Sequence, residues 1–464
     1  MPKPKMTRPT GLVPLLVAAI AASLLSVAAA SNTTTTSSQP GRLQGLLVQV
    51  SRWRERHLAA PSSSLSGGGA AHGVRPNTVA AWVLSFLAAS VSSAGGVGGG
   101  SLFLPIVNVV AGLSLKRATA YSSFMVTGGA VSNVLYNLLA CAGGGSGGGQ
   151  LINYDIALLF QPCLLLGVSI GVVCNVMFPE WLITVLFSLF LVFCTAKTYH
   201  AGVKIWRSES SGGGHHSSKE PLLPTDAQDG RGNGVGFPWP EVALLVMIWI
   251  CFFALHVVIG DKDGKGVIRI KPCSVAYWLV TLFQLPAAVA FTCYILYAKR
   301  KKQVAHNQED GKSDLVEARM DTLPSLTFPL VAFVTGALSG IFGIGGGLLL
   351  NPVLLQIGIP PQTTAATTSF MVLFSASMSM AQYILLGMEG IGQASIYAGI
   401  CFVASVVGVV VIERAIRRSG RVSLIVLLVT AVLALSTVIV TVFGAQDVWM
   451  QYISGAYMGF KLPC

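Results

Sequence analysis

The sequence predicts an all-α polytopic membrane protein with two inverted four-segment repeats, each opening with a glycine-broken re-entrant or discontinuous helix, joined by a two-helix linker. Three observations lead to this fold class. Hydrophobic residues make up 53% of the 464 residues and charged residues only 10%, against about 25% charged residues in a typical soluble domain. Apolar stretches long enough to cross a bilayer recur along the chain, and a glycine-rich motif occurs twice.

Charge and cysteine patterns narrow the classes of function. The formal net charge is +12, but the basic residues gather in the polar loops and ends, without interleaved aromatic residues. That placement indicates membrane topology and predicts no nucleic-acid partner. The nine cysteines are scattered mostly through apolar runs without a C-x-x-C pair. We therefore expect no disulfide framework, no metal site and no cofactor.

The N-terminal region has the pattern of a secretory signal peptide. Three basic residues precede an apolar run over 12–25 and three consecutive alanines, so we predict a signal peptide over 1–30. An uncleaved first membrane span is the alternative. Residues 31–76 form a polar N-terminal region rich in Ser, Gly and Pro. A signal peptide on a multi-pass membrane protein predicts a location in the endomembrane system or the plasma membrane.

Ten apolar segments of about spanning length follow this region. Two long polar segments divide them into two groups of four, with one pair of segments between the groups. The ten segments are Val79–Gly112, Ala118–Cys141, Asp155–Phe178, Trp181–Ala201, Val242–Gly260, Ser274–Ala298, Leu326–Gly358, Thr363–Met388, Gly390–Ile412 and Val422–Gly444. The predicted organisation is repeat 1 over 77–202, a polar loop over 203–237, the linker over 238–298, a basic cytoplasmic loop over 299–324, repeat 2 over 325–444 and a C-terminal tail over 445–464.

The two groups of four share motifs at nearly the same spacing. A Gly-x-Gly-Gly-Gly run begins at Gly96 in the first group and at Gly343 in the second, and a proline follows each run. Further along, Ser-Phe-Met-Val begins at Ser123 and again at Ser369. Two independent matches at matching distances indicate an internal duplication.

With Gly-x-Gly-Gly-Gly-x-x-x-x-Pro in both halves, ending at Pro105 and Pro352, the chain resembles the sulfite exporter TauE/SafE family of anion permeases, particularly its plant branch. The resemblance extends over about 79–444. The signal-like start and the loop at 207–236 lie outside the family pattern. The resemblance implies a polytopic permease for small anions such as sulfite, sulfonates or related organosulfur compounds.

The glycine runs predict a helix break near mid-membrane. Consecutive glycines interrupt a helix and free backbone N–H groups, and Ser101 stands where an N-cap would restart it. The N-terminal end of the new half-helix can hold an anion without a nearby arginine. Residues 79–112 as one continuous helix would be about 51 Å long, against a hydrocarbon core of about 30 Å. Close helix packing through G-x-x-x-G pairs is the alternative interpretation of the same glycines.

Clusters of basic residues predict the orientation, because Lys and Arg favour the cytoplasmic side. The clusters at 299–302 and 414–421 share that side only if the glycine segment between them re-enters and returns. The same rule applied to repeat 1 leaves the mature N-terminus outside and the polar loop inside, so the two repeats are inverted. Lys116 and Arg117 then lie outside, which is an exception to the rule.

We predict a substrate site at the glycine runs and at the hydroxyl and amide side chains near them. No acidic or basic residue lies near the middle of any of the ten segments, which favours N–H and hydroxyl donors over charged ligands. The predicted substrate-binding residues are Gly96, Gly98, Gly99, Gly100, Ser101, Ser122, Ser123, Gly343, Gly345, Gly346, Gly347, Asn351, Thr368 and Ser369. His256 is the candidate for proton coupling, with a neutral histidine hydrogen-bonded between helices as the alternative.

The sequence thus predicts a membrane transporter, a permease or exporter, that moves a small inorganic or organosulfur anion through a lipid bilayer by alternating access. A polytopic scaffold or sensor that acts through its polar loops is the alternative. An enzyme is not expected, because the chain has no H-E-x-x-H motif and no pair of intramembrane carboxylates. No pattern in the sequence predicts an oligomeric state.

Overall fold

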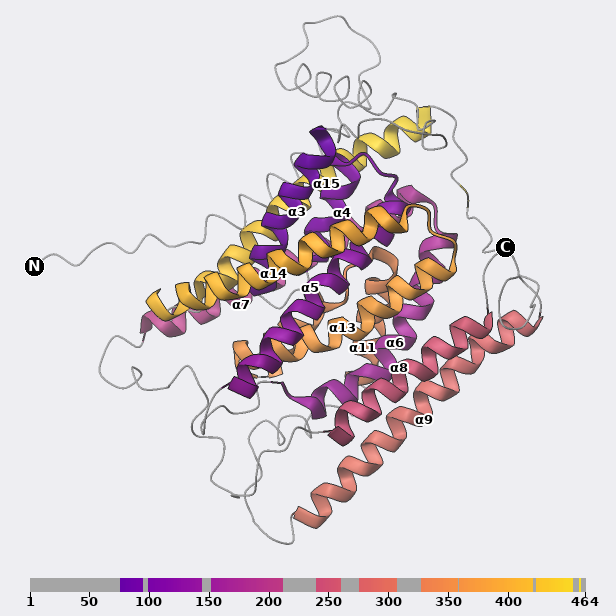
Figure 1. The fold of residues 1–464 in the computed structure, drawn as a ribbon, viewed down its shortest axis with the longest axis vertical. Helices are drawn as coiled ribbons and strands as arrows, with labels where there is room; N and C mark the ends of the chain where they lie inside the picture. Colours follow the sequence, from indigo (N-terminus) through magenta and orange to yellow (C-terminus); the bar gives the residue numbers. More distant parts are fainter. Residues whose placement is uncertain are drawn as a thin grey trace, which may run out of the picture.

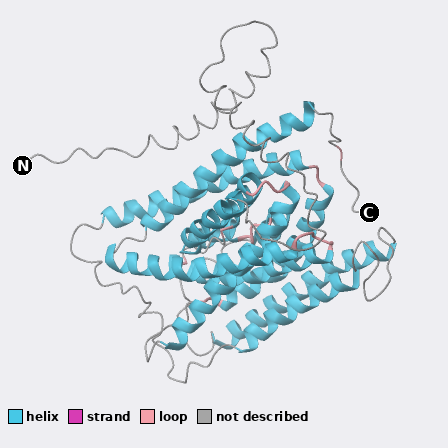
Figure 2. Cartoon of the chain, turned by 45° about the horizontal axis from the view of Figure 1, so that its top comes forward, coloured by secondary structure: helices cyan, strands magenta, loops and turns pink. Residues whose placement is uncertain are grey.

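A computed structural model of the chain describes residues 76–94, 99–143, 152–211, 239–259, 275–306, 327–357, 359–419, 423–453 and 459. Every regular element within these ranges is helical, as Figures 1 and 2 show. The all-α fold class is confirmed. The predicted signal peptide, nearly all of the polar N-terminal region and the greater part of the two long polar loops lie outside the described residues.

The helices are grouped here by the predicted repeats and the predicted linker. Repeat 1 comprises α3 (Pro76–Ala94), α4 (Gly100–Pro105), the π-helix η2 (Ile106–Val110), α5 (Leu115–Gly143), α6 (Tyr154–Met177) and α7 (Glu180–Ser211). The linker comprises α8 (Trp239–Ile259) and α9 (Val275–His306). Repeat 2 comprises α11 (Thr327–Phe342), α12 (Gly347–Ile357), α13 (Pro361–Leu385), α14 (Ile391–Ser419) and α15 (Ser423–Ile453).

Within the described residues, six helices are long and apolar enough to cross a membrane, and they belong to α6, α7, α8, α13, α14 and α15. The chain is therefore a multi-pass integral membrane protein. The apolar helices on either side of the glycine runs are shorter, as expected for a discontinuous helix. In repeat 2 the first piece ends at Phe342 and the second begins at Gly347.

Small residues allow the backbones of α6 and α11 to touch. A Cβ atom added at Gly336 would lie 2.1 Å from the Leu164 carbonyl oxygen, and one added at Gly171 would lie 2.2 Å from the Ala337 carbonyl oxygen. Both distances are far inside van der Waals contact, so no side chain fits there. Gly336 and Gly340 have the G-x-x-x-G spacing that is typical of close helix packing.

α3 and α14, which correspond to α11 and α6 in the opposite repeats, pack in the same way. α3 lies against α14, where a Cβ atom added at Gly408 would lie 2.1 Å from the Ser90 carbonyl oxygen. α5 contacts α14 as α13 contacts α6, while α5 packs on α13 and α7 packs on α15. The set of contacts is the same when the two repeats are exchanged, as expected of a duplicated chain.

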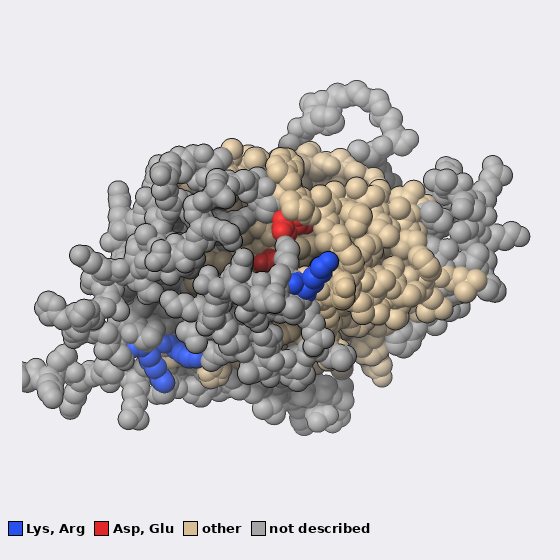
Figure 3. Space-filling view, turned by 90° about the horizontal axis from the view of Figure 1, so that it is seen from below, with Lys and Arg blue, Asp and Glu red and all other residues tan. Residues whose placement is uncertain are grey.

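The linker helices α8 and α9 lie at one side of the molecule, against α6 (Figure 1). Large apolar side chains on α9 face outward, with Leu282 and Phe283 59% and 58% exposed. Charged side chains among the described residues are few on the face shown in Figure 3. The outward apolar side chains of α9 suit contact with lipid rather than water.

The structure gives a physical account of Lys116 and Arg117, the exception to the charge rule. Lys116 Nζ donates to the Val176 carbonyl oxygen at 2.7 Å, at the C-terminal end of α6. Arg117 forms an ion pair with Glu389 in the turn before α14. Both cations thus have partners at this end of the molecule, and the Arg117 charge is offset by a carboxylate.

Candidate functional site

The glycine loop between α11 and α12, residues 343–346, is the centre of the candidate site. Gly343, Gly345 and Gly346 have φ angles of 65°, 77° and 78°, in the left-handed region that residues with a Cβ atom rarely adopt. The whole loop is buried within the protein. The sequence folds this way locally because the glycines end α11 at Phe342 and adopt left-handed backbone angles before α12 begins at Gly347.

Side chains from three helices donate hydrogen bonds to carbonyl groups of the loop and of the last turn of α11. Tyr383 Oη donates to the Gly340 carbonyl oxygen at 3.0 Å and Asn175 Nδ2 to that of Ile341 at 2.7 Å. Ser122 Oγ donates to the Gly343 carbonyl oxygen at 2.9 Å and Ser375 Oγ to that of Gly345 at 2.8 Å. The donors come from α5 and α6 of repeat 1 and α13 of repeat 2, so both repeats fix the loop.

The N–H groups at the loop and at the start of α12, unlike the carbonyl groups, are mostly without a hydrogen-bond partner among the described residues. Leu349 N and Leu350 N both donate to the Gly346 carbonyl oxygen, each at 3.3 Å. For the N–H groups of residues 344–348, the described part of the chain shows no acceptor. Because buried backbone donors are nearly always paired, and because a helix N-terminus carries partial positive charge, this cluster of N–H groups can bind an anion.

The two repeats meet at this loop. A Cβ atom added at Gly345 would lie 2.6 Å from Val126 Cγ1 and 2.8 Å from Val372 Cγ1. These valines end the two Ser-Phe-Met-Val motifs. A Cβ atom added at Gly100 would lie 2.3 Å from Ile344 Cα. The duplicated motifs, far apart in the sequence, are therefore in contact with one another.

The repeat 1 glycine run differs from its counterpart. Gly96 and Gly98 lie outside the described residues, and Gly99 has a φ angle of 71°. The helix that follows, α4, has six residues and continues directly into η2. Ser101 is buried, and its carbonyl oxygen accepts a hydrogen bond from Ser436 Oγ at 2.6 Å.

The remaining predicted residues occupy different environments. Ser123 and Thr368 donate to carbonyl oxygens of their own helices, Thr119 and Thr364, at 3.2 and 2.6 Å. Ser369 is buried on α13 and Asn351 is buried on α12.

Sequence reasoning missed Asn175 and Tyr383 as partners of the loop. The signal available for both was an isolated polar side chain inside an apolar segment.

His256 on α8 belongs to a buried polar network that joins four helices. Its Nε2 atom lies 2.9 Å from Ser169 Oγ on α6 and 2.9 Å from Gln382 Nε2 on α13. It also lies 3.3 Å from Gln284 Nε2 on α9. The network connects the linker to the repeats, because His256 and Gln284 lie on the linker helices whereas Ser169 and Gln382 lie on the repeats. Gln382 is next in the chain to Tyr383, which donates to the Gly340 carbonyl oxygen.

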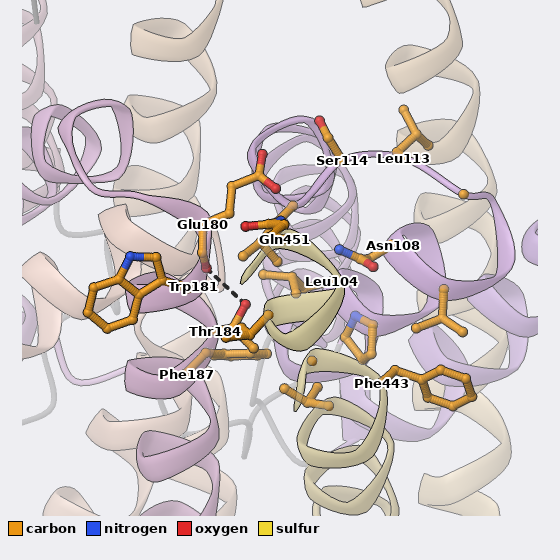
Figure 4. Close-up of a pocket in the computed structure, with 17 residues that line it drawn as sticks. Leu104, Asn108, Leu113, Ser114, Glu180, Trp181, Thr184, Phe187, Phe443 and Gln451 are labelled. Atoms are coloured by element: carbon orange, nitrogen blue, oxygen red, sulfur yellow. Dashed lines mark hydrogen bonds between the residues drawn. The ribbon is translucent and has the colours of Figure 1, made fainter. Parts of the chain in front are cut away.

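A cavity of about 310 Å³ lies beside the first half-helix, between α4–η2, α7 and α15. Figure 4 shows Asn108, Glu180 and Gln451 around it, with Thr184 Oγ1 bonded to the Glu180 carbonyl oxygen at 2.9 Å. Phe187 lines the cavity, and its ring centroid lies 4.8 Å from that of Phe342, the residue before the glycine loop. Phe187 thus contacts both the cavity and the end of α11 that leads into the loop.

The described residues contain no group of three or more His, Cys, Asp or Glu side chains that could hold a metal ion. The chemistry available at the glycine loop is hydrogen-bond donation from backbone and hydroxyl groups. Such a donor set suits a small anion that accepts several hydrogen bonds.

Comparison with known proteins identifies the family. A family model described as sulfite exporter TauE/SafE matches residues 5–198 and 242–438. The match begins at residue 5, so the expectation that the N-terminal start lies outside the family pattern is wrong. The polar loop at 207–236 does lie between the two matched ranges, as expected. No solved structure matches the chain.

Several plant proteins are similar over most of their length. "Sulfite exporter TauE/SafE family protein 5" of Arabidopsis thaliana is 46% identical over 444 residues, which cover 92% of this chain and 94% of that protein. "Sulfite exporter TauE/SafE family protein 2" of the same plant is 48% identical over 407 residues, covering 84% and 88%. A shorter similarity, 43% identity over 49 residues, links the chain to "Probable membrane transporter protein YunE" of Bacillus subtilis (strain 168).

Proposed function

The chain belongs to the sulfite exporter TauE/SafE family of membrane transporters, and from that membership we propose that its substrate is a small anion, sulfite or a related organosulfur anion such as a sulfonate. The proposed site is the glycine loop at 343–346 with the N-terminal end of α12. Gly100 of repeat 1 packs against Ile344 of this loop.

One observation carries the proposal. The carbonyl groups around the loop accept hydrogen bonds from Ser122, Asn175, Ser375 and Tyr383. The N–H groups of 344–348 have no acceptor among the described residues. A loop built only for packing would need partners for both kinds of group, since an unpaired buried donor costs about 1–3 kcal/mol. An anion that accepts these hydrogen bonds removes that cost.

We further propose that the repeats are inverted and that transport occurs by alternating access. Ring contacts support the inversion: Trp82 lies against Tyr397 near the starts of α3 and α14, and Phe160 against Phe328 near the starts of α6 and α11. α3 therefore runs with α14, and α11 runs with α6. Lys116 binds the end of α6 and its neighbour Arg117 binds the turn before α14. In this arrangement α3 and α11 begin at opposite faces.

Flux into liposomes tests the function. We expect purified full-length protein to carry labelled sulfite across the membrane, and competition by sulfate, thiosulfate and sulfonates to define the substrate class. Gly346→Val should eliminate transport, because a valine at a φ angle of 78° is strained and its side chain fills the space beside the N–H groups. Gly399→Val is the matched control, since no atom lies within 4 Å of a Cβ added there.

Liposomes with folded wild-type protein that show no sulfite flux above empty liposomes would contradict the assignment of sulfite. Full transport by Gly346→Val would contradict the assignment of the loop.

A further inference from the structure

Four buried serine hydroxyls in the described residues have no hydrogen-bond partner, and one of them lies at the proposed site. They belong to Ser85, Ser132, Ser339 and Ser379. Buried hydroxyls normally find a partner, so each exception calls for an explanation. Ser339 on α11 is the one that the structure places among the nearest neighbours of Gly346.

The surroundings of Gly346 leave more room than those of the other loop glycines. The nearest heavy atom to a Cβ added at Gly346 is Thr335 Cγ2 at 3.3 Å, and Ser339 Cβ follows at 3.7 Å. The corresponding nearest distances are 2.1 Å at Gly343 and 2.6 Å at Gly345. Ser339 is thus one of the side chains nearest to Gly346, the last loop residue before α12 begins at Gly347.

The hydroxyl of Ser339 also departs from the usual behaviour of helical serines. Ser92, Ser169 and Thr437 each donate to the carbonyl oxygen four residues earlier, at 2.8, 3.0 and 2.7 Å, a common arrangement in membrane helices. Ser339 is fully buried and makes no such bond. Its donor is therefore available to a ligand.

We propose that Ser339 is an anion ligand: its hydroxyl donates a hydrogen bond to the oxyanion that the N–H groups of 344–348 bind. This inference rests on the proposed function, and it adds a side chain to a site otherwise made of backbone groups. The resulting set contains hydrogen-bond donors only and no cation. It therefore recognises an oxyanion by donating hydrogen bonds to its oxygen atoms rather than by ion pairing. Ser122 and Ser375 act differently, because their hydroxyls are bound to loop carbonyls.

Binding of sodium sulfite to the purified full-length protein in detergent micelles tests the inference, measured by titration calorimetry and by the ligand-induced rise in unfolding temperature. Ser339→Ala should weaken sulfite binding by about 10- to 100-fold, the loss expected for one hydrogen bond to a charged group. Ser132→Ala is the matched control, since it also removes a buried hydroxyl without a partner. It should bind sulfite as the wild type does.

The unfolding temperature in the absence of sulfite shows whether Ser339 binds the anion or instead stabilises the fold. Because neither hydroxyl has a partner in the protein, Ser339→Ala and Ser132→Ala should both unfold within a few degrees of the wild type. Ser339→Cys, whose thiol is a weak donor, is a second variant of similar shape and should also bind sulfite more weakly. Failure of both Ser339 variants to fold would overturn the inference, because the hydroxyl would then serve the fold.

Gly346→Val distinguishes the role of the loop from the role of Ser339. If this variant loses sulfite binding while Ser339→Ala keeps the wild-type Kd, the loop is the site and the role of Ser339 is refuted. If Gly346→Val binds sulfite as the wild type does, the proposed site itself is refuted, and the inference falls with it.

Discussion

Ser122→Ala is the sharpest test of how the loop is held, because it removes a single contact between the repeats. Ser122 is fully buried on α5 of repeat 1 and donates to the Gly343 carbonyl oxygen of repeat 2 at 2.9 Å, a normal hydrogen-bond length. Alanine leaves that carbonyl group without its donor. An unsatisfied buried acceptor costs about 1–3 kcal/mol, so we expect a loss of this size in the free energy of unfolding.

The neighbouring serine provides the control. Ser123 is equally buried, but its hydroxyl donates to the Thr119 carbonyl oxygen in its own helix. That carbonyl also accepts the backbone hydrogen bond of α5, so Ser123→Ala leaves no group unpaired, and we expect a change below about 0.5 kcal/mol. The pair of variants isolates the contact with the loop from the general effect of losing a buried hydroxyl.

The measurement combines denaturant unfolding of both variants in micelles with sulfite flux in liposomes. We expect Ser122→Ala to lose both stability and transport, and Ser123→Ala to retain both. Equal stability and equal flux for the two variants would show that the Ser122 contact neither fixes the loop nor supports its function.

Three further predictions concern topology, coupling and packing. Cysteines introduced at Gly212 and Ser419, in a variant without native thiols, should both be labelled only from the cytosolic side, whereas labelling from opposite faces would remove the re-entrant model. If a pH gradient drives transport, His256→Ala should abolish that dependence, and a dependence that survives would place coupling elsewhere. Gly336→Ala should cost about 1–3 kcal/mol in the free energy of unfolding, because its Cβ would lie 2.1 Å from the Leu164 carbonyl oxygen; Gly399→Ala, in open space, should cost less than 1 kcal/mol.

The helix breaks were predictable because glycine runs have a local physical meaning. Gly343, Gly345 and Gly346 adopt backbone angles that other residues avoid, so their presence in an apolar segment is itself a signal. The starts of the long helices lie close to those of the predicted apolar segments, whose length the bilayer fixes. α7, α9 and α15 nevertheless continue past the ends of those segments, to Ser211, His306 and Ile453. These features depend on short stretches of sequence and need no knowledge of tertiary contacts.

The side-chain roles at the site could not be predicted in the same way. Ser122 and Ser123 are adjacent and chemically identical, and Ser123 Oγ also lies beside Gly343, yet only Ser122 donates to the loop, whereas Ser123 donates to its own backbone. The contacts of Asn175 and Tyr383 with the loop depend on where α6 and α13 cross α11. The partner of Arg117 could not be predicted either, because Glu389, with which it forms an ion pair, is far away in the sequence.

The backbone contact between α6 and α11 restricts how the transporter can move. Where no side chain separates two helices, sliding one along the other forces carbonyl groups past each other, so the two helices travel as one rigid body. The contact between Ser90 and Gly408 restrains α3 and α14 in the same manner. Each body therefore combines a half-helix of one repeat with a full helix of the other. In the alternating-access mechanism proposed above, the contact of α5 with α13, where Gly345 lies between Val126 and Val372, would then be one of the places where the two bodies move relative to each other.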